Sequence, residues 1–115
     1  MAIKVKRVYE PPSKEDGLRV LVDRIWPRGL SKTATAVDLW ARDLAPSTAL
    51  RKWFGHDPGR WEAFCARYAR ELDTRSGEAS RLNAEGRKRT VTLLFGAKDA
   101  ARNNAVALKH YLDTM

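Results

Sequence analysis

A short apolar run from Leu18 to Val22, ending abruptly in a charged pair, limits the folds open to this 115-residue chain more than any other segment. The run consists of leucine, valine and one arginine, a composition typical of a strand inside a sheet. Asp23 and Arg24 follow at once, and proline and glycine then break regular structure over residues 26–29. The sequence therefore predicts an interior strand whose carboxyl end leads into a rigid, charged and aromatic loop.

Other strand-like segments alternate with helical patterns. Residues 3–8 alternate apolar with basic side chains, as a half-buried strand does, and residues 90–95 are apolar and β-branched. Residues 37–44 fit a strand or a helix, and the nearby Pro46 favours an extended form. Helices are expected over 47–54, 58–72, 78–84 and 99–112, with a break at Ser76-Gly77 and with Asp57 and Asp99 as caps.

This alternation predicts an α/β fold: a single compact domain over residues 1–115, with a small, mainly parallel sheet flanked by helices. The length fits one domain, and the chain has no internal repeat. One cysteine excludes an internal disulfide and a cysteine-based zinc cage. With no apolar leader and no long apolar run, we expect a cytoplasmic protein without a membrane partner, either a monomer or a homodimer.

The charge of the chain indicates an anionic partner. Lys and Arg number 22 against 14 Asp and Glu, a formal net charge of +8 that resides in residues 1–32 and 81–115. Arg87-Lys88-Arg89 is the densest basic run, and such a run contacts phosphates in nucleic-acid-binding proteins. A three-residue run before a predicted strand is also typical of a solvated turn, and no known nucleic-acid-binding motif accompanies it.

The loop after the predicted interior strand carries the strongest candidate site, because ligands of open α/β sheets bind at the carboxyl ends of strands. Arg24 and Arg28 have the chemistry to clamp an anion, Trp26 to stack on a ring, and Asp23 to move a proton. The alternative is structural: an ion pair between Asp23 and Arg24, with Trp26 filling the core.

Three more positions extend this candidate site. His56 beside Asp57 has the composition of a general base, although Asp57 before Pro58 is better explained as a helix cap. Arg51 offers another cation, and the amide of Asn104 has the chemistry to bind a polar ligand. Cys65 lies on an apolar helical face and is expected in the core. No metal ligand set and no standard nucleotide-loop or hydrolase motif is present, so any cofactor stays unknown.

Long blocks of the chain resemble the YeaO-like proteins of the domain-of-unknown-function family 488. They are residues 16–30 (DGLRVLVDRIWPRGL), 43–47 (DLAPS), 50–58 (LRKWFGHDP) and 103–106 (NNAV). The resemblance covers nearly the whole chain and implies a compact cytoplasmic α/β protein with no established reaction, cofactor or catalytic residue. It draws attention to the polar and aromatic motif positions Asp23, Arg24, Trp26, Arg28, Asp43, Arg51, His56 and Asn104.

These observations lead to one functional hypothesis and two alternatives. Because several arginines fall beside Asp and Trp in the motif blocks, we expect binding of a small anionic, nucleotide-like molecule, with hydrolysis or group transfer as the reaction if the protein is an enzyme. Nucleic-acid binding through the basic N- and C-terminal segments is the first alternative. A non-catalytic accessory or interaction protein that uses exposed tryptophans is the second.

Overall fold

A computed structural model describes residues 2–115, which form a four-stranded sheet with every strand parallel to its neighbours. The strands lie in the order β1 (Ile3–Arg7), β4 (Val91–Phe95), β2 (Leu18–Leu21) and β3 (Leu39–Trp40). All five residues of β4 are buried, because β4 lies between two strands and has both faces covered. The expected α/β domain is therefore confirmed, and its sheet is wholly parallel.

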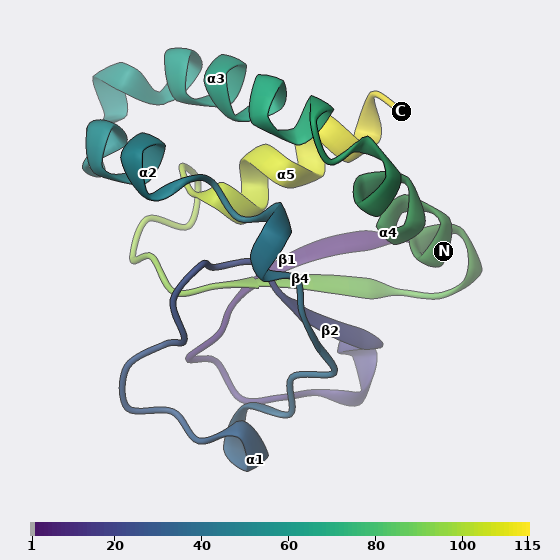
Figure 1. The fold of residues 1–115 in the computed structure, drawn as a ribbon. Coiled ribbons are helices and arrows are strands. Elements are labelled where there is room, and N and C mark those ends of the chain that lie inside the picture. The colour runs from purple at the N-terminus through teal and green to yellow at the C-terminus, as the bar shows by residue number, and fades with distance from the viewer. Residues whose placement is uncertain (1) are drawn as a thin grey trace.

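The helices are divided unequally between the two faces of the sheet (Figure 1). One face carries α2 (Thr48–Phe54), α3 (Trp61–Asp73), α4 (Ser76–Lys88) and α5 (Asn104–Asp113). The opposite face is covered by the loop that follows β2 and by the single turn α1 (Lys32–Thr35). Short 3-10 helices lie at Lys14–Asp16, Arg42–Leu44 and Pro58–Arg60.

Three helix starts differ from the sequence prediction. Helix α3 begins at Trp61, after the 3-10 turn Pro58–Arg60, and not at Pro58. Ser76-Gly77 was predicted to be a break, but α4 begins at Ser76 and continues to Lys88. It passes through Gly86, where an added Cβ would lie 2.7 Å from Cγ1 of Ile3, so close packing of the helix on β1 outweighs the low helix propensity of glycine. Helix α5 is capped by Asn103, and Asp99 instead accepts hydrogen bonds from Ala101 and Arg102 in the preceding turn.

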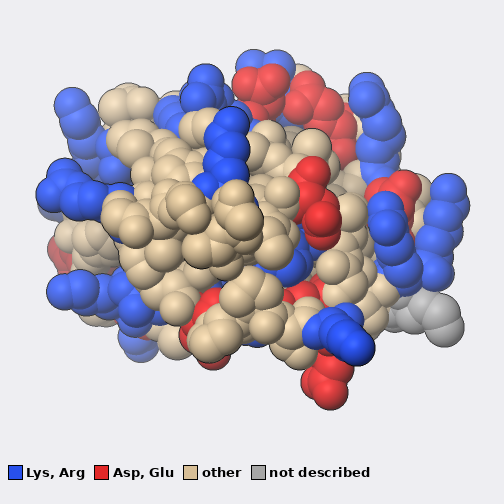
Figure 2. Space-filling view, turned by 90° about the horizontal axis from the view of Figure 1, so that it is seen from below, with Lys and Arg blue, Asp and Glu red and all other residues tan. Residues whose placement is uncertain are grey.

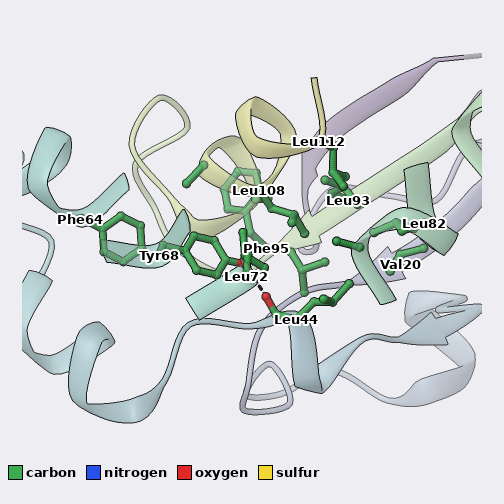
Figure 3. Packing of buried hydrophobic residues seen from close by; sticks show 14 of the residues in the cluster. Val20, Leu44, Phe64, Tyr68, Leu72, Leu82, Leu93, Phe95, Leu108 and Leu112 are labelled. Carbon is green, nitrogen blue, oxygen red and sulfur yellow. Dashed lines mark hydrogen bonds between the residues drawn. The ribbon is translucent and has the colours of Figure 1, made fainter. Parts of the chain in front are cut away.

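The main core fills the space between the sheet and the four helices (Figure 3). The hydroxyl of Tyr68 is fully buried there and donates a hydrogen bond to the carbonyl oxygen of Leu44, which joins α3 to the segment after β3. A smaller cluster of Val8, Leu21 and Leu94 lies on the other face of the sheet, covered in part by Trp26 and Trp40. Strand residues thus alternate between two cores, as the period of a strand requires.

A buried ion cluster fixes the beginning of β2. Arg19 is 3% exposed, and its guanidinium donates to the carboxylate of Asp16 and to the carbonyl oxygen of Thr35. Lys6 Nζ lies 3.1 Å from Oδ2 of the same carboxylate. Gly17 between them has φ +61°, and a Cβ there would lie 2.2 Å from the carbonyl oxygen of Thr90. This position therefore requires glycine for both conformation and space.

We expect Asp16→Asn to destabilise the fold by about 3 kcal/mol near neutral pH, because Arg19 would keep a buried charge without its counter-ion. Burial acts to raise the pKa of Asp16, but hydrogen bonds from Ser13, Lys6 and Arg19 outweigh it and lower the pKa overall. The stabilisation is therefore present above the ordinary carboxyl pKa of about 3.9 and is lost as the pH falls through the folded-state value. Urea unfolding of both proteins across this pH range measures the effect, and an unchanged difference down to acid pH would contradict it.

Candidate functional site

A pocket of about 260 Å³ lies where the carboxyl ends of β2 and β4 meet the beginning of α5. Its walls come from the loops after both strands, from α2 and its end, and from α3. This is the edge of an open parallel sheet at which ligands bind in α/β proteins. The lining residues are Asp23, Arg24, Ile25, Pro46, Arg51, Phe54, His56, Phe64, Gly96, Ala97, Arg102, Asn103 and Asn104.

The carboxylate of Asp23 ties these segments together. Its Oδ2 accepts a hydrogen bond from the backbone N–H of Gly96 at 2.9 Å, and its Oδ1 accepts one from Nδ2 of Asn104 at 2.9 Å. Nδ2 of Asn104 also donates to the carbonyl oxygen of Val22 at 2.9 Å, and Nε1 of Trp40 donates to the carbonyl oxygen of Asp23 at 2.7 Å. Asp23, a single residue in the loop after β2, thereby links β3, β4 and α5.

Burial raises the pKa of Asp23 above its ordinary value. The hydrogen bonds from Asn104 and Gly96, and the positive charge of Arg51, act in the opposite direction and offset only part of the rise. Gly96 allows the close approach, since a Cβ at this position would lie 2.9 Å from Oδ2 of Asp23. The site therefore holds a carboxylate whose ionised form is disfavoured by desolvation. Both of its oxygens accept hydrogen bonds, one from Gly96 and one from Asn104.

Three arginines line the pocket, and they differ in how they are held. Nε and Nη2 of Arg24 donate to the carbonyl oxygens of Pro46 and Ala45, at 3.0 and 3.2 Å. Arg102 lies 3.7 Å from Asp99 in an exposed ion pair. Within residues 2–115 the guanidinium of Arg51 has neither a hydrogen bond nor an ion pair, so its donors are open to a ligand.

The position of Arg51 is set by the start of α2. The hydroxyl of Ser47 accepts from the backbone N–H of Leu50 at 3.1 Å and donates to Oε2 of Glu71 at 2.6 Å. Oε1 of Glu71 accepts from the backbone N–H of Ser47 at 2.8 Å. The helix cap is thus bonded to α3, which fixes the backbone of α2 from which Arg51 extends.

His56 lies at the rim with an unusual backbone conformation. Its φ is +58° and follows φ +53° at Gly55, so two successive residues are in the left-handed region. Such a conformation strains a residue with a side chain, although histidine tolerates it better than most. The exposed ring lies 6.4 Å from that of Phe54, between centroids. Asp57 accepts from Gly59, which fits the cap expected from the sequence.

The structure brings five of the seven sequence-predicted site residues to one pocket: Asp23, Arg24, Arg51, His56 and Asn104. The other two, Trp26 and Arg28, are not among its lining residues. Trp26 packs edge-on to Trp40 at 5.4 Å on the other face of the sheet, and its Nε1 donates to Leu30. Arg28 is exposed, and its carbonyl oxygen accepts from the hydroxyl of Tyr9.

Sequence reasoning missed Arg102 and the aromatic part of the pocket. Phe54 and Phe64, whose stacked rings lie 4.4 Å apart between centroids, form a wall of the site. Arg102 directly precedes Asn103-Asn104 in the loop between a strand and a helix. Ligands of open α/β sheets bind at the carboxyl ends of strands, and Arg102 lies in the loop after the strand at residues 90–95. The rule that selected the loop after Val22 therefore applies to Arg102 as well.

Several other features of the described chain bear on the chemistry. No group of three or more His, Cys, Asp and Glu side chains among residues 2–115 has the arrangement that a metal ion needs. Cys65 is partly buried against the main core, and burial raises the pKa of its thiol. None of the helices in these residues combines the length and apolar character that crossing a membrane requires.

Comparisons with known proteins place the chain among relatives of its own length. The profile of a family described as "Inactive DUF488-N3 subclade" matches residues 2–115. The chain is 41% identical over 115 residues to "Uncharacterized protein YeaO" of Escherichia coli, covering all of both chains. It is 40% identical over 111 residues to "Uncharacterized protein Rv3073c" of Mycobacterium tuberculosis, covering 96% of this chain and 93% of that one. No solved structure matches.

We expect Asn104→Ala to raise the pKa of Asp23 further, because the ionised carboxylate loses one of its donors. The free energy of unfolding at neutral pH should fall by about 1–3 kcal/mol, since the carbonyl oxygen of Val22 also loses its partner. Carboxyl carbon NMR titration and urea unfolding measure the two effects. Lys109→Ala, at an exposed pair on the same helix, is the control, and an unchanged Asp23 titration would contradict the assigned link.

Proposed function

Because the chain belongs to the family described as the inactive DUF488-N3 subclade, we propose that its pocket binds a small anionic molecule without transforming it. The observation that carries this proposal is Arg51, an arginine that lines the pocket and has no partner within the described residues. Arg24 and Arg102 bring the lining to three guanidinium groups against the one carboxylate of Asp23. Guanidinium groups bind phosphate and carboxylate through paired, charge-assisted hydrogen bonds.

The size of the pocket restricts the class of ligand. Its volume of about 260 Å³ is below the range of about 300–1,000 Å³ that is usual for pockets holding drug-sized molecules. Inorganic phosphate, a small carboxylate or a small phosphate ester fits this size, as does the anionic end of a longer molecule. The aromatic wall of Phe54 and Phe64 favours a ligand with an apolar or planar portion beside its charge.

The same geometry supports binding rather than catalysis. Both oxygens of Asp23 accept hydrogen bonds, and both amide hydrogens of Asn104 are accounted for by its two acceptors. A general acid or base needs to reach the reacting atom of the substrate, whereas these groups hold the fold. His56 is the lining residue that retains a free proton-transfer group, and it would serve here as a ligand contact.

The basic run Arg87-Lys88-Arg89 has structural roles, and this favours a small ligand over nucleic acid. Arg87 and Lys88 form the last turn of α4, where cations interact favourably with the helix dipole, and Arg89 bonds to Glu85. On the face that carries α1, Lys and Arg lie mostly toward the rim, and uncharged side chains cover much of the middle (Figure 2). The proposal includes a cytoplasmic location, which a single free cysteine favours.

Arg51→Gln should weaken the binding of inorganic phosphate or phenyl phosphate by roughly tenfold or more, because a charge-assisted pair is lost. Isothermal titration calorimetry gives the affinity, and amide NMR shifts at Gly96 and Asn104 locate the ligand. Lys52→Gln removes the same charge from an exposed neighbour that does not line the pocket, and it should leave the affinity nearly unchanged. Equal losses in the two variants, or no binding to the native protein, would overturn the proposal.

His56→Asn should weaken anion binding while changing the free energy of unfolding by less than about 0.5 kcal/mol, because asparagine also tolerates a positive φ. His56→Val should destabilise the fold by about 1–2 kcal/mol at the same site, since a β-branched residue is strained there. Calorimetric titration and urea unfolding of both variants separate the contact from the conformation. Full affinity in His56→Asn would show that the ring does not contact the anion.

A further inference from the structure

The two edges of the sheet are protected very differently. Edge strand β1 carries Lys4 and Lys6, and charged side chains on an edge discourage the addition of another strand. Edge strand β3 consists of Leu39 and Trp40 alone, and Leu39 is 48% exposed. The residue just before it, Asp38, is exposed and accepts a hydrogen bond from the backbone N–H of Arg19 on β2. The β3 edge therefore leaves apolar surface uncovered.

A groove of about 880 Å³ lies between this edge and α4. Its apolar lining includes four leucines and Trp40, and its charged lining contains as many acidic as basic side chains. The chain as a whole has a formal charge of +8, whereas the charged lining of this groove is balanced. Two copies of this chain repel each other less here than across a basic face.

The charges on the α4 side of the groove are arranged symmetrically. Glu78, Arg81, Glu85 and Lys88 follow one another at spacings of three, four and three residues, which places them on one face of the helix. Glu78 and Lys88 lie five residues on either side of Asn83, and Arg81 and Glu85 lie two on either side. Read in the opposite direction, the signs along this face are reversed.

We propose that this groove is the interface of a homodimer, in which α4 packs antiparallel to α4 of a second copy about a two-fold axis at the level of Asn83. In that arrangement Glu78 faces Lys88 of the second copy, and Arg81 faces Glu85 of the second copy. A two-fold interface requires a surface that is complementary to itself, and this helix face meets that condition at all four charges. The second copy also covers Leu39 on the β3 edge.

Existing contacts leave these charges free to pair across the interface. Glu78 lies 3.6 Å from Arg75 and Glu85 lies 3.1 Å from Arg89, both in exposed ion pairs. Exposed pairs contribute about 0–1 kcal/mol, and a carboxylate has acceptor sites for a second donor. Thirteen residues line the groove, fewer than the roughly 20–30 residues per partner of a standard interface. The dimer should therefore be weak and should dissociate on dilution.

Sedimentation velocity of the full chain, from micromolar to millimolar concentration at physiological salt, tests the proposal. The native protein should change from monomer to dimer over this range. Arg81→Glu and Glu85→Arg should each raise the dissociation constant roughly tenfold or more. By symmetry, each substitution places two pairs of like charges opposite each other across the interface. The double variant Arg81→Glu with Glu85→Arg should restore the dimer, because every cross-pair is again between opposite charges.

Arg87→Glu is the matched control, since Arg87 is exposed on the same helix and does not line the groove. Circular dichroism melting confirms that each variant is folded, and rescue by the double variant excludes a loss through misfolding. A native protein that stays monomeric throughout would overturn the proposal. So would a dimer that neither single reversal weakens, because association would then use another face.

Discussion

The partly buried carboxylate of Asp23 holds the carboxyl edge of the sheet in place. Its two oxygens accept hydrogen bonds from Gly96 and Asn104, which are 73 and 81 residues away along the chain. Parallel strands have no hairpin to set their ends in register, so side-chain bonds across the strand ends do part of that work. Desolvation disfavours the ionised form of this carboxylate and raises its pKa. Hydrogen bonds from Asn104 and Gly96 offset part of that effect.

Two of the three arginines around this edge, Arg24 and Arg51, form no ion pair with an acidic side chain among the described residues, whereas Arg102 is paired with Asp99. Arg24 is bonded to two carbonyl oxygens, and Arg51 is carried by a helix whose cap is bonded to Glu71. A cation that already has a carboxylate partner gives up that pair to bind an anion, whereas these arginines need not. The result is a small pocket lined by three guanidinium groups and one carboxylate.

Residue patterns close together in the sequence predicted much of this structure. The interior strand, the strand at residues 90–95 and the cap at Asp57 all follow from composition and turn chemistry, which act over a few residues. The continuous helix α4 did not follow, because Gly86 is favoured there by its contact with Ile3, a residue distant in sequence. Asn103 replaced Asp99 as the cap of α5 for a similar reason: both residues have capping chemistry, and the fold decides where the helix begins.

The sequence by itself determined the α/β class, the charged loop after the interior strand and a set of seven candidate site residues, five of which line the pocket. The tertiary structure alone decided which of them share that pocket. Asp23, Trp26 and Arg28 lie within six residues of one another, yet Trp26 packs on the opposite face of the sheet and Arg28 lies outside the pocket. A loop leaving a strand can turn to either face, and the choice rests on burial of Trp26 against Trp40, Leu21 and Leu94, contacts that no local pattern contains.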